Sequence, residues 1–68
     1  MSITLKAARV NKRLTQKEAA EQLGIAVSTL IQYEAGRTFP DVPILRKMEE
    51  LYEVSYNEID FFSVTKTV

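Results

Sequence analysis

The chain has 68 residues, a formal net charge of zero, and neither cysteine nor histidine. A chain of this length forms one small domain that buries only about 60% of its unfolded surface, so we expect marginal stability. The missing residue types exclude a disulfide framework and a thiolate metal site, and they remove the commonest general base and metal ligand. We therefore predict a chain without enzyme activity, metal or cofactor.

Charge is unevenly divided along the chain. Residues 1–40 carry six Lys or Arg and three Asp or Glu, a net charge of +3. Residues 41–68 carry three Lys or Arg and six Asp or Glu, a net charge of −3. The first thirteen residues hold four basic side chains and no acidic one. Chance clustering in a short chain would explain this split. The alternative is a basic half directed at phosphates.

The chain shows no internal repeat, no low-complexity segment and no interdomain linker. We predict one domain over residues 1–62, followed by a short tail of residues 63–68. No segment resembles an export signal, and no apolar run approaches the length of a membrane span. We therefore expect no membrane contact and a location in the cytoplasm.

The first two predicted helices lie within the first 23 residues. Ser2 is a candidate cap for a helix that runs to about Arg13. The segment "TQKE" (15–18) fits a capping box and opens a second helix, which Gly24 ends with a left-handed residue. The inward positions of these two helices are Ile3, Leu5, Ala8, Ala19, Ala20 and Leu23.

Three more helices are predicted after Gly24. The third spans about residues 27–35, and Asp41 caps a fourth, with Pro43 in the first turn where a missing N–H is tolerated. The segment "SYNE" (55–58) fits a second capping box and starts a short fifth helix. The inward positions are Leu45, Met48, Leu51, Tyr52, Ile59 and Phe62. The sequence therefore predicts an all-α domain, a compact bundle of five short helices.

Only three residues separate Leu23 from Val27, so the second and third helices must cross at a steep angle. Two helices joined by a three- or four-residue turn that contains Gly form a helix-turn-helix. The small side chains of Ala19 and Ala20 let the two helices approach closely, and Ile25 would fill the space between them.

The third helix has two distinct faces at 100° per residue. One side carries Ala26, Leu30 and Tyr33, and the other carries Val27, Ser28, Ile31, Gln32 and Ala35, none of them charged. Base edges in the major groove are read by amides, hydroxyls and small apolar groups. We therefore predict base contacts from Val27, Ser28, Ile31 and Gln32. The alternative is that Ile31 packs in a core or dimer contact and Gln32 is solvated.

Seven residues or short segments, in a fixed order along the chain, combine these helix-turn-helix features with others. They are Leu14-Thr15-Gln16, Leu23-Gly24-Ile25, Ser28-Thr29-Leu30, Tyr33-Glu34, Gly36, Pro40 and Val54-Ser55. Over residues 5 to about 59, the chain resembles the Cro/repressor-type helix-turn-helix domains, also called the XRE family. It departs from that pattern at Arg13, where a glycine is frequent, and at Ala26, where a serine is frequent.

The resemblance implies that the third helix lies in the major groove. It implies backbone contacts from Gln16, at a helix N-terminus where phosphate is favoured, and from Arg37 and Thr38. Lys12, Arg13 and Lys17 are further backbone candidates, and the alternative is that they are solvated. It also implies an ion pair between Arg9 and Glu34, with two solvated side chains as the alternative.

We therefore predict a sequence-specific, double-stranded-DNA-binding transcription regulator of the repressor kind. It would act as a homodimer on a roughly palindromic operator. Dimerisation would use the acidic C-terminal half, with Phe61, Phe62 and Val64 in the interface, although both phenylalanines could instead pack within one protomer. The alternative function is an antitoxin or another protein-interaction module built on the same fold.

Overall fold

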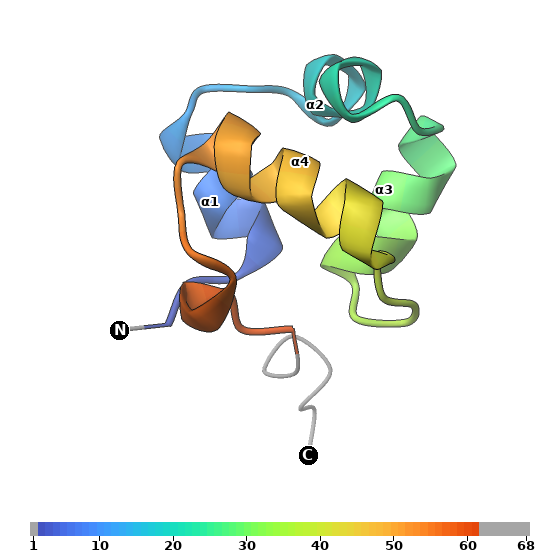
Figure 1. The fold of residues 1–68 in the computed structure, drawn as a ribbon. Coiled ribbons are helices and arrows are strands. Elements are labelled where there is room, and N and C mark those ends of the chain that lie inside the picture. The colour runs from blue at the N-terminus through green and yellow to red at the C-terminus, as the bar shows by residue number, and fades with distance from the viewer. Residues whose placement is uncertain (1, 62–68) are drawn as a thin grey trace.

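The computed structural model describes residues 2–61, which form four α-helices and one 3-10 turn. The elements are α1 (Leu5–Asn11), α2 (Gln16–Leu23), α3 (Val27–Glu34), α4 (Val42–Tyr52) and the turn η1 (Tyr56–Glu58). In Figure 1, α4 runs across the middle of the molecule between α1 and α3, and α2 lies above it. The all-α prediction is confirmed, but the prediction of five α-helices is wrong over the described residues.

The predicted fifth helix is the single turn η1, because the chain becomes extended directly after it. The predicted capping box is present, and the Ser55 backbone N–H donates to Glu58 Oε1 at 3.0 Å. Ile59 then has extended backbone and forms a parallel bridge with Ile3. The Ile3 N–H donates to the carbonyl of Glu58 at 2.7 Å, and the Asp60 N–H donates to the carbonyl of Ile3 at 2.8 Å. This bridge ties the N-terminal segment to the chain after α4.

The prediction for the first helix is wrong at both ends. Thr4, not Ser2, is the cap, and its side-chain oxygen accepts a hydrogen bond from the Ala7 N–H at 3.1 Å. The residues before Thr4 are used in the bridge and cannot begin a helix. At the other end, α1 stops at Asn11, and Arg13 adopts a left-handed backbone with φ of 59°. That conformation costs an L-residue about 1–2 kcal/mol, and glycine avoids the cost.

The other predicted helix signals are confirmed. Thr15 and Glu18 form a reciprocal capping box with hydrogen bonds of 2.9 and 3.1 Å. Gly24 ends α2 with a φ of 72°. Asp41 caps α4, and its Oδ1 accepts from the Ile44 N–H at 3.1 Å. Local side-chain chemistry therefore sets the limits of α2 and the start of α4.

The hydrophobic core draws on all four α-helices and on the bridge. Its buried residues are Leu5, Ala8, Ala19, Ala20, Leu23, Leu30, Met48, Tyr52 and Ile59. Leu45 and Leu51, also predicted to face inward, are partly buried against it. The side chains of Ala19 and Ala20 end at Cβ, so α2 can lie close against α3.

Four predictions concern residues beyond those that the structure describes. They are the domain boundary at residue 62, the tail of residues 63–68, the inward position of Phe62, and the place of Phe62 and Val64 in a dimer interface. Among the described helices, none is long and apolar enough to cross a membrane.

Candidate nucleic-acid interface

Three residues join α2 to α3 in a tight turn. Gly24 takes the left-handed conformation, and the Ile25 N–H donates to the carbonyl of Ala20 at 3.0 Å. The Ile25 side chain is partly buried against the core, as predicted. Ala26 follows with extended backbone and no side-chain cap, so the first N–H groups of α3 lack the partner that a serine would supply. The two helices and their turn form a helix-turn-helix.

The two sides of α3 differ as the helical period predicts. Leu30 is fully buried and Tyr33 is partly buried. On the opposite side, Val27 and Ile31 keep 37% and 41% of their surface exposed, Ser28 is exposed, and Gln32 is half-buried. We call this surface the α3 outer face and define it as Val27, Ser28, Ile31 and Gln32. It is neutral, and it combines an amide, a hydroxyl and two aliphatic side chains.

One buried carboxylate fixes the end of α3. Arg9 Nε donates to Glu34 Oε2 at 2.7 Å, and a second guanidinium nitrogen of Arg9 donates to Oε1 at 3.3 Å. Gln16 Nε2 donates to the same Oε1 at 3.1 Å. Arg9 also donates to the carbonyl of Leu14 at 2.8 Å. The predicted ion pair is therefore present and buried, and it joins α3 to α1 and to the first turn of α2.

The predicted backbone-contacting residues have different environments. The side chains of Arg13, Lys17, Arg37 and Thr38 are exposed. Gln16 is half-buried because its amide is held by Glu34. Sequence reasoning missed this hydrogen bond, since helical periodicity does not show which residues of two different helices meet.

Lys12 is already engaged in an ion pair within the chain. Its Nζ lies 2.8 Å from Glu53 Oε2, just after the end of α4. The hydrogen bond and the charge of Lys12 lower the pKa of the Glu53 carboxyl. Lys12 thus faces the acidic second half of the chain. Sequence reasoning missed Glu53 too, because no local pattern around residue 53 points to a partner just after α1.

A family model described as Helix-turn-helix matches residues 5–59 of the chain. This chain belongs to the helix-turn-helix family. It is also 47% identical over 51 residues to the HTH-type transcriptional regulator ImmR of Bacillus subtilis (strain 168). That alignment covers 75% of this helix-turn-helix chain and 40% of ImmR, so the chain spans less than half the length of this relative. No solved structure matches the chain.

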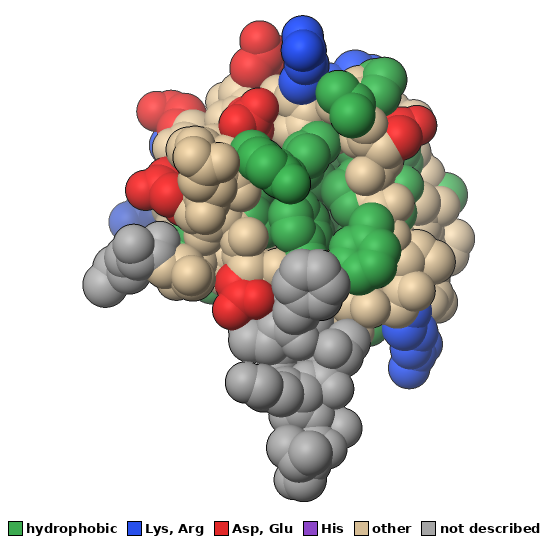
Figure 2. Space-filling view, turned by 60° about the horizontal axis from the view of Figure 1, so that its bottom comes forward, with side chains coloured by type: hydrophobic (Ala, Val, Ile, Leu, Met, Phe, Trp, Pro, Cys, Tyr) green, Lys and Arg blue, Asp and Glu red, His purple; other side chains and the backbone are tan. Residues whose placement is uncertain are grey.

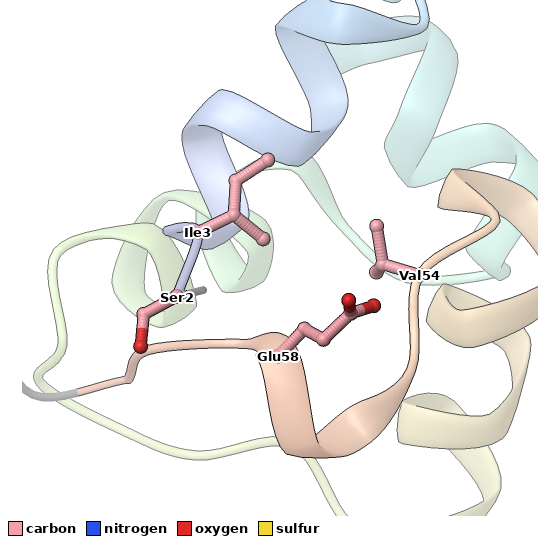
Figure 3. A pocket seen from close by; sticks show the side chains of 4 residues that line it. All are labelled: Ser2, Ile3, Val54 and Glu58. Carbon is pink, nitrogen blue, oxygen red and sulfur yellow. The ribbon is translucent and has the colours of Figure 1, made fainter.

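Away from the helix-turn-helix itself, a hollow of about 300 Å³ lies beside the N-terminal segment. Figure 3 shows its lining side chains, Ser2, Ile3, Val54 and Glu58. Ile3 and Val54 are apolar, and Glu58 already accepts a hydrogen bond from a backbone N–H. The hollow therefore lacks the converging polar groups of a ligand site. No cluster of three or more His, Cys, Asp or Glu side chains within residues 2–61 could hold a metal ion.

Proposed function

We propose that this chain is a sequence-specific regulator of transcription, acting as a repressor, that places α3 in the major groove of duplex DNA. The α3 outer face carries the proposal, because it is neutral and rich in groups that match base edges, with Val27, Ser28 and Ile31 exposed and Gln32 half-buried. A solvated helix face would be expected to carry charged side chains instead. The similarity to ImmR, a transcriptional regulator by name, supports the same function.

Each residue of the α3 outer face has a distinct role in this proposal. The Gln32 amide offers a donor and an acceptor, the pattern that adenine requires in the major groove. Ser28, one turn earlier, donates to or accepts from a base edge. Val27 and Ile31 contact thymine methyl groups.

Contacts to the DNA backbone would come from both sides of the helix-turn-helix. Gln16 and Lys17 occupy the first turn of α2, where free backbone N–H groups favour a phosphate. The Gln16 amide nitrogen has two hydrogens, and Glu34 uses one of them, so the other can donate to a phosphate. Arg37 and Thr38 follow α3. Arg13 adds an exposed charge, whereas Lys12 would first have to leave Glu53.

The same proposal includes a homodimer. One α3 helix reads only a short half-site, so two copies would bind a roughly palindromic operator with half-site centres about 34 Å apart. A regulator of this kind acts where the chromosome is accessible, which implies the cytoplasm.

The test compares two substitutions on duplexes that carry either the preferred site, selected from random DNA, or a scrambled site. Gln32→Ala should lower affinity for the preferred site by about 1–3 kcal/mol and relax the preference at one position per half-site. Arg37→Ala should lower the affinity for both duplexes by the same factor. It should also reduce the slope of log affinity against log salt concentration by about one unit per protomer. An equal loss on both duplexes for Gln32→Ala would contradict its role in reading bases.

A second candidate function is a protein-interaction module such as an antitoxin. The observation that favours it is the group of exposed apolar side chains Phe39, Val42 and Tyr56, outside the helix-turn-helix. A protein that co-purifies with the chain, together with equal affinity for preferred and scrambled duplexes, would support this alternative.

A further inference from the structure

The α3 outer face consists of two stripes of different chemistry. Val27 and Ile31 lie one turn apart on the same side of the helix, and so do Ser28 and Gln32, because the members of each pair are four residues apart. The first pair is aliphatic and the second is polar. We call Val27 and Ile31 the aliphatic stripe. Both of its side chains are exposed, so the aliphatic stripe is not part of the core.

The surroundings of the aliphatic stripe favour DNA as its partner. The one charged side chain of α3, Glu34, is buried and paired with Arg9, so α3 exposes no carboxylate beside the stripe. Other exposed apolar side chains have different neighbours: Val42 and Tyr56 line a hollow together with Glu49. Figure 2 likewise shows hydrophobic side chains on one side of the molecule with acidic side chains around them. Exposed carboxylates repel phosphates, whereas the aliphatic stripe can approach the DNA backbone closely.

The chemistry of an aliphatic side chain limits what it can read on a base edge. Valine and isoleucine have neither a hydrogen-bond donor nor an acceptor in the side chain. In the major groove, thymine presents an O4 acceptor and a C5 methyl group, whereas cytosine presents an N4 donor. An aliphatic side chain gains from contact with the methyl group but has no means of distinguishing the O4 acceptor from the N4 donor. It therefore responds to the methyl group, whichever pyrimidine carries it.

We propose that the aliphatic stripe recognises the C5 methyl group of pyrimidines, so that 5-methylcytosine can replace thymine opposite it and cytosine methylation strengthens binding. This inference rests on the proposed function, because it requires α3 to lie in the major groove. It goes further in making DNA binding sensitive to the methylation state of the site. Val27 and Ile31 are about 6 Å apart along the helix, and base pairs are stacked about 3.4 Å apart, so the two methyl groups lie within about two base steps of each other.

The first test uses the wild-type chain and modified duplexes, with affinity measured by fluorescence anisotropy. Each thymine of the preferred site is replaced in turn by uracil, which removes the C5 methyl group and leaves the hydrogen-bonding edge unchanged. Exposure of one methyl-sized group predicts a loss of about fourfold in affinity at one or two positions of each half-site. At the same positions, a C·G pair is compared with the same pair carrying 5-methylcytosine, and methylation should raise the affinity by about fourfold.

Two variants assign each methyl group to a side chain. Ile31→Ala should abolish the effect of the methyl group at one position and Val27→Ala at another, because the alanine side chain is too short to keep the contact. Both side chains are exposed and alanine favours the helix, so both variants should fold. Val10→Ala is the matched control: Val10 is an exposed aliphatic residue of α1, outside the helix-turn-helix, and its truncation should leave both methyl effects unchanged.

The proposal is overturned if removing and adding the methyl group leave wild-type affinity unchanged at every position. A methyl effect that persists in both alanine variants would also overturn it, since the group would then act through the shape of the DNA. A wild-type chain that prefers the selected site over a scrambled one but ignores methyl groups would refute this inference alone, and would leave another protein or a second copy as the partner of the aliphatic stripe. A wild-type chain that binds both duplexes alike would refute the proposed function, and this inference with it.

Discussion

Removal of the Glu34 carboxylate should cost the domain a large part of its free energy of unfolding. The side chains of Arg9 and Glu34 are only 9% and 5% exposed, and their closest atoms are 2.7 Å apart. In Glu34→Ala the guanidinium of Arg9 stays buried with the Leu14 carbonyl as its remaining partner in this network, and the Gln16 amide loses its acceptor. The unpaired charge, rather than the lost attraction, is the main cost.

The expected loss is large compared with the total stability. Removing one partner of a buried pair costs about 3–5 kcal/mol. At 0.05–0.15 kcal/mol per residue, a chain of 68 residues has roughly 3–10 kcal/mol in all. With a urea dependence of about 1 kcal/mol per molar for so small a domain, the unfolding midpoint should fall by about 3 M or more. At the lower end of the stability range, the variant would be unfolded in buffer.

Urea unfolding followed by circular dichroism at the helical band measures this loss. The matched control is Glu53→Ala, because the Lys12–Glu53 pair has nearly the same length, 2.8 Å, but its side chains are 33% and 73% exposed. Exposed pairs contribute little, so this variant should unfold close to wild type. If Glu34→Ala also unfolded within about 0.5 kcal/mol of wild type, as an ordinary surface change does, burial would not determine the strength of the pair.

Three further predictions concern stability. Burial, and secondly the Glu34 carboxylate, raises the pKa of Tyr52 from 10.0 to about 12. Between these two pH values the native state keeps a proton that the unfolded chain loses, so about 2–3 kcal/mol of stability that is fully present below pH 10 should be lost between pH 10 and 12. Tyr52→Phe should not show this loss. Arg13→Gly should raise the free energy of unfolding by about 1 kcal/mol by relieving the left-handed backbone, and Arg13→Ala should give no such gain. Ala26→Ser should add about 1 kcal/mol by capping α3, measured by thermal unfolding, and no gain would mean that solvent already satisfies those N–H groups.

The parts of the fold that the sequence predicts correctly are those that local chemistry determines. The capping box of Thr15 and Glu18, the left-handed Gly24 and the cap at Asp41 each act within four residues of themselves. The errors arise where distant segments meet. The bridge between Ile3 and Ile59 removes Ser2 from the first helix and prevents a fifth helix, and no periodicity reveals such a pairing.

The candidate site shows the same division. The exposed side of α3 follows from helical period alone, because Leu30 and Tyr33 must face the core. The partners of the polar side chains do not follow from it. Gln16 was predicted only as a backbone contact, yet its amide also supports Glu34. The resemblance makes Lys12 and Lys17 equal candidates for contacts to the DNA backbone. In the structure, however, Lys12 is paired with Glu53, whereas Lys17 is exposed.

The two ends of α3 are supported unequally, and this bears on how the helix would read DNA. Glu34 occupies the C-terminal end, where the helix dipole disfavours a carboxylate. Arg9 pairs with this carboxylate, and together with Gln16 it anchors that end to two other helices. The N-terminal end has no side-chain cap at Ala26. Gln32 therefore projects from the end of α3 that Glu34 and its partners anchor, whereas Val27 and Ser28 project from the end that has no side-chain cap. Specificity should accordingly depend most on the base position that Gln32 is proposed to contact, and capping the first turn should improve affinity by stabilising that end of the helix rather than by adding a contact.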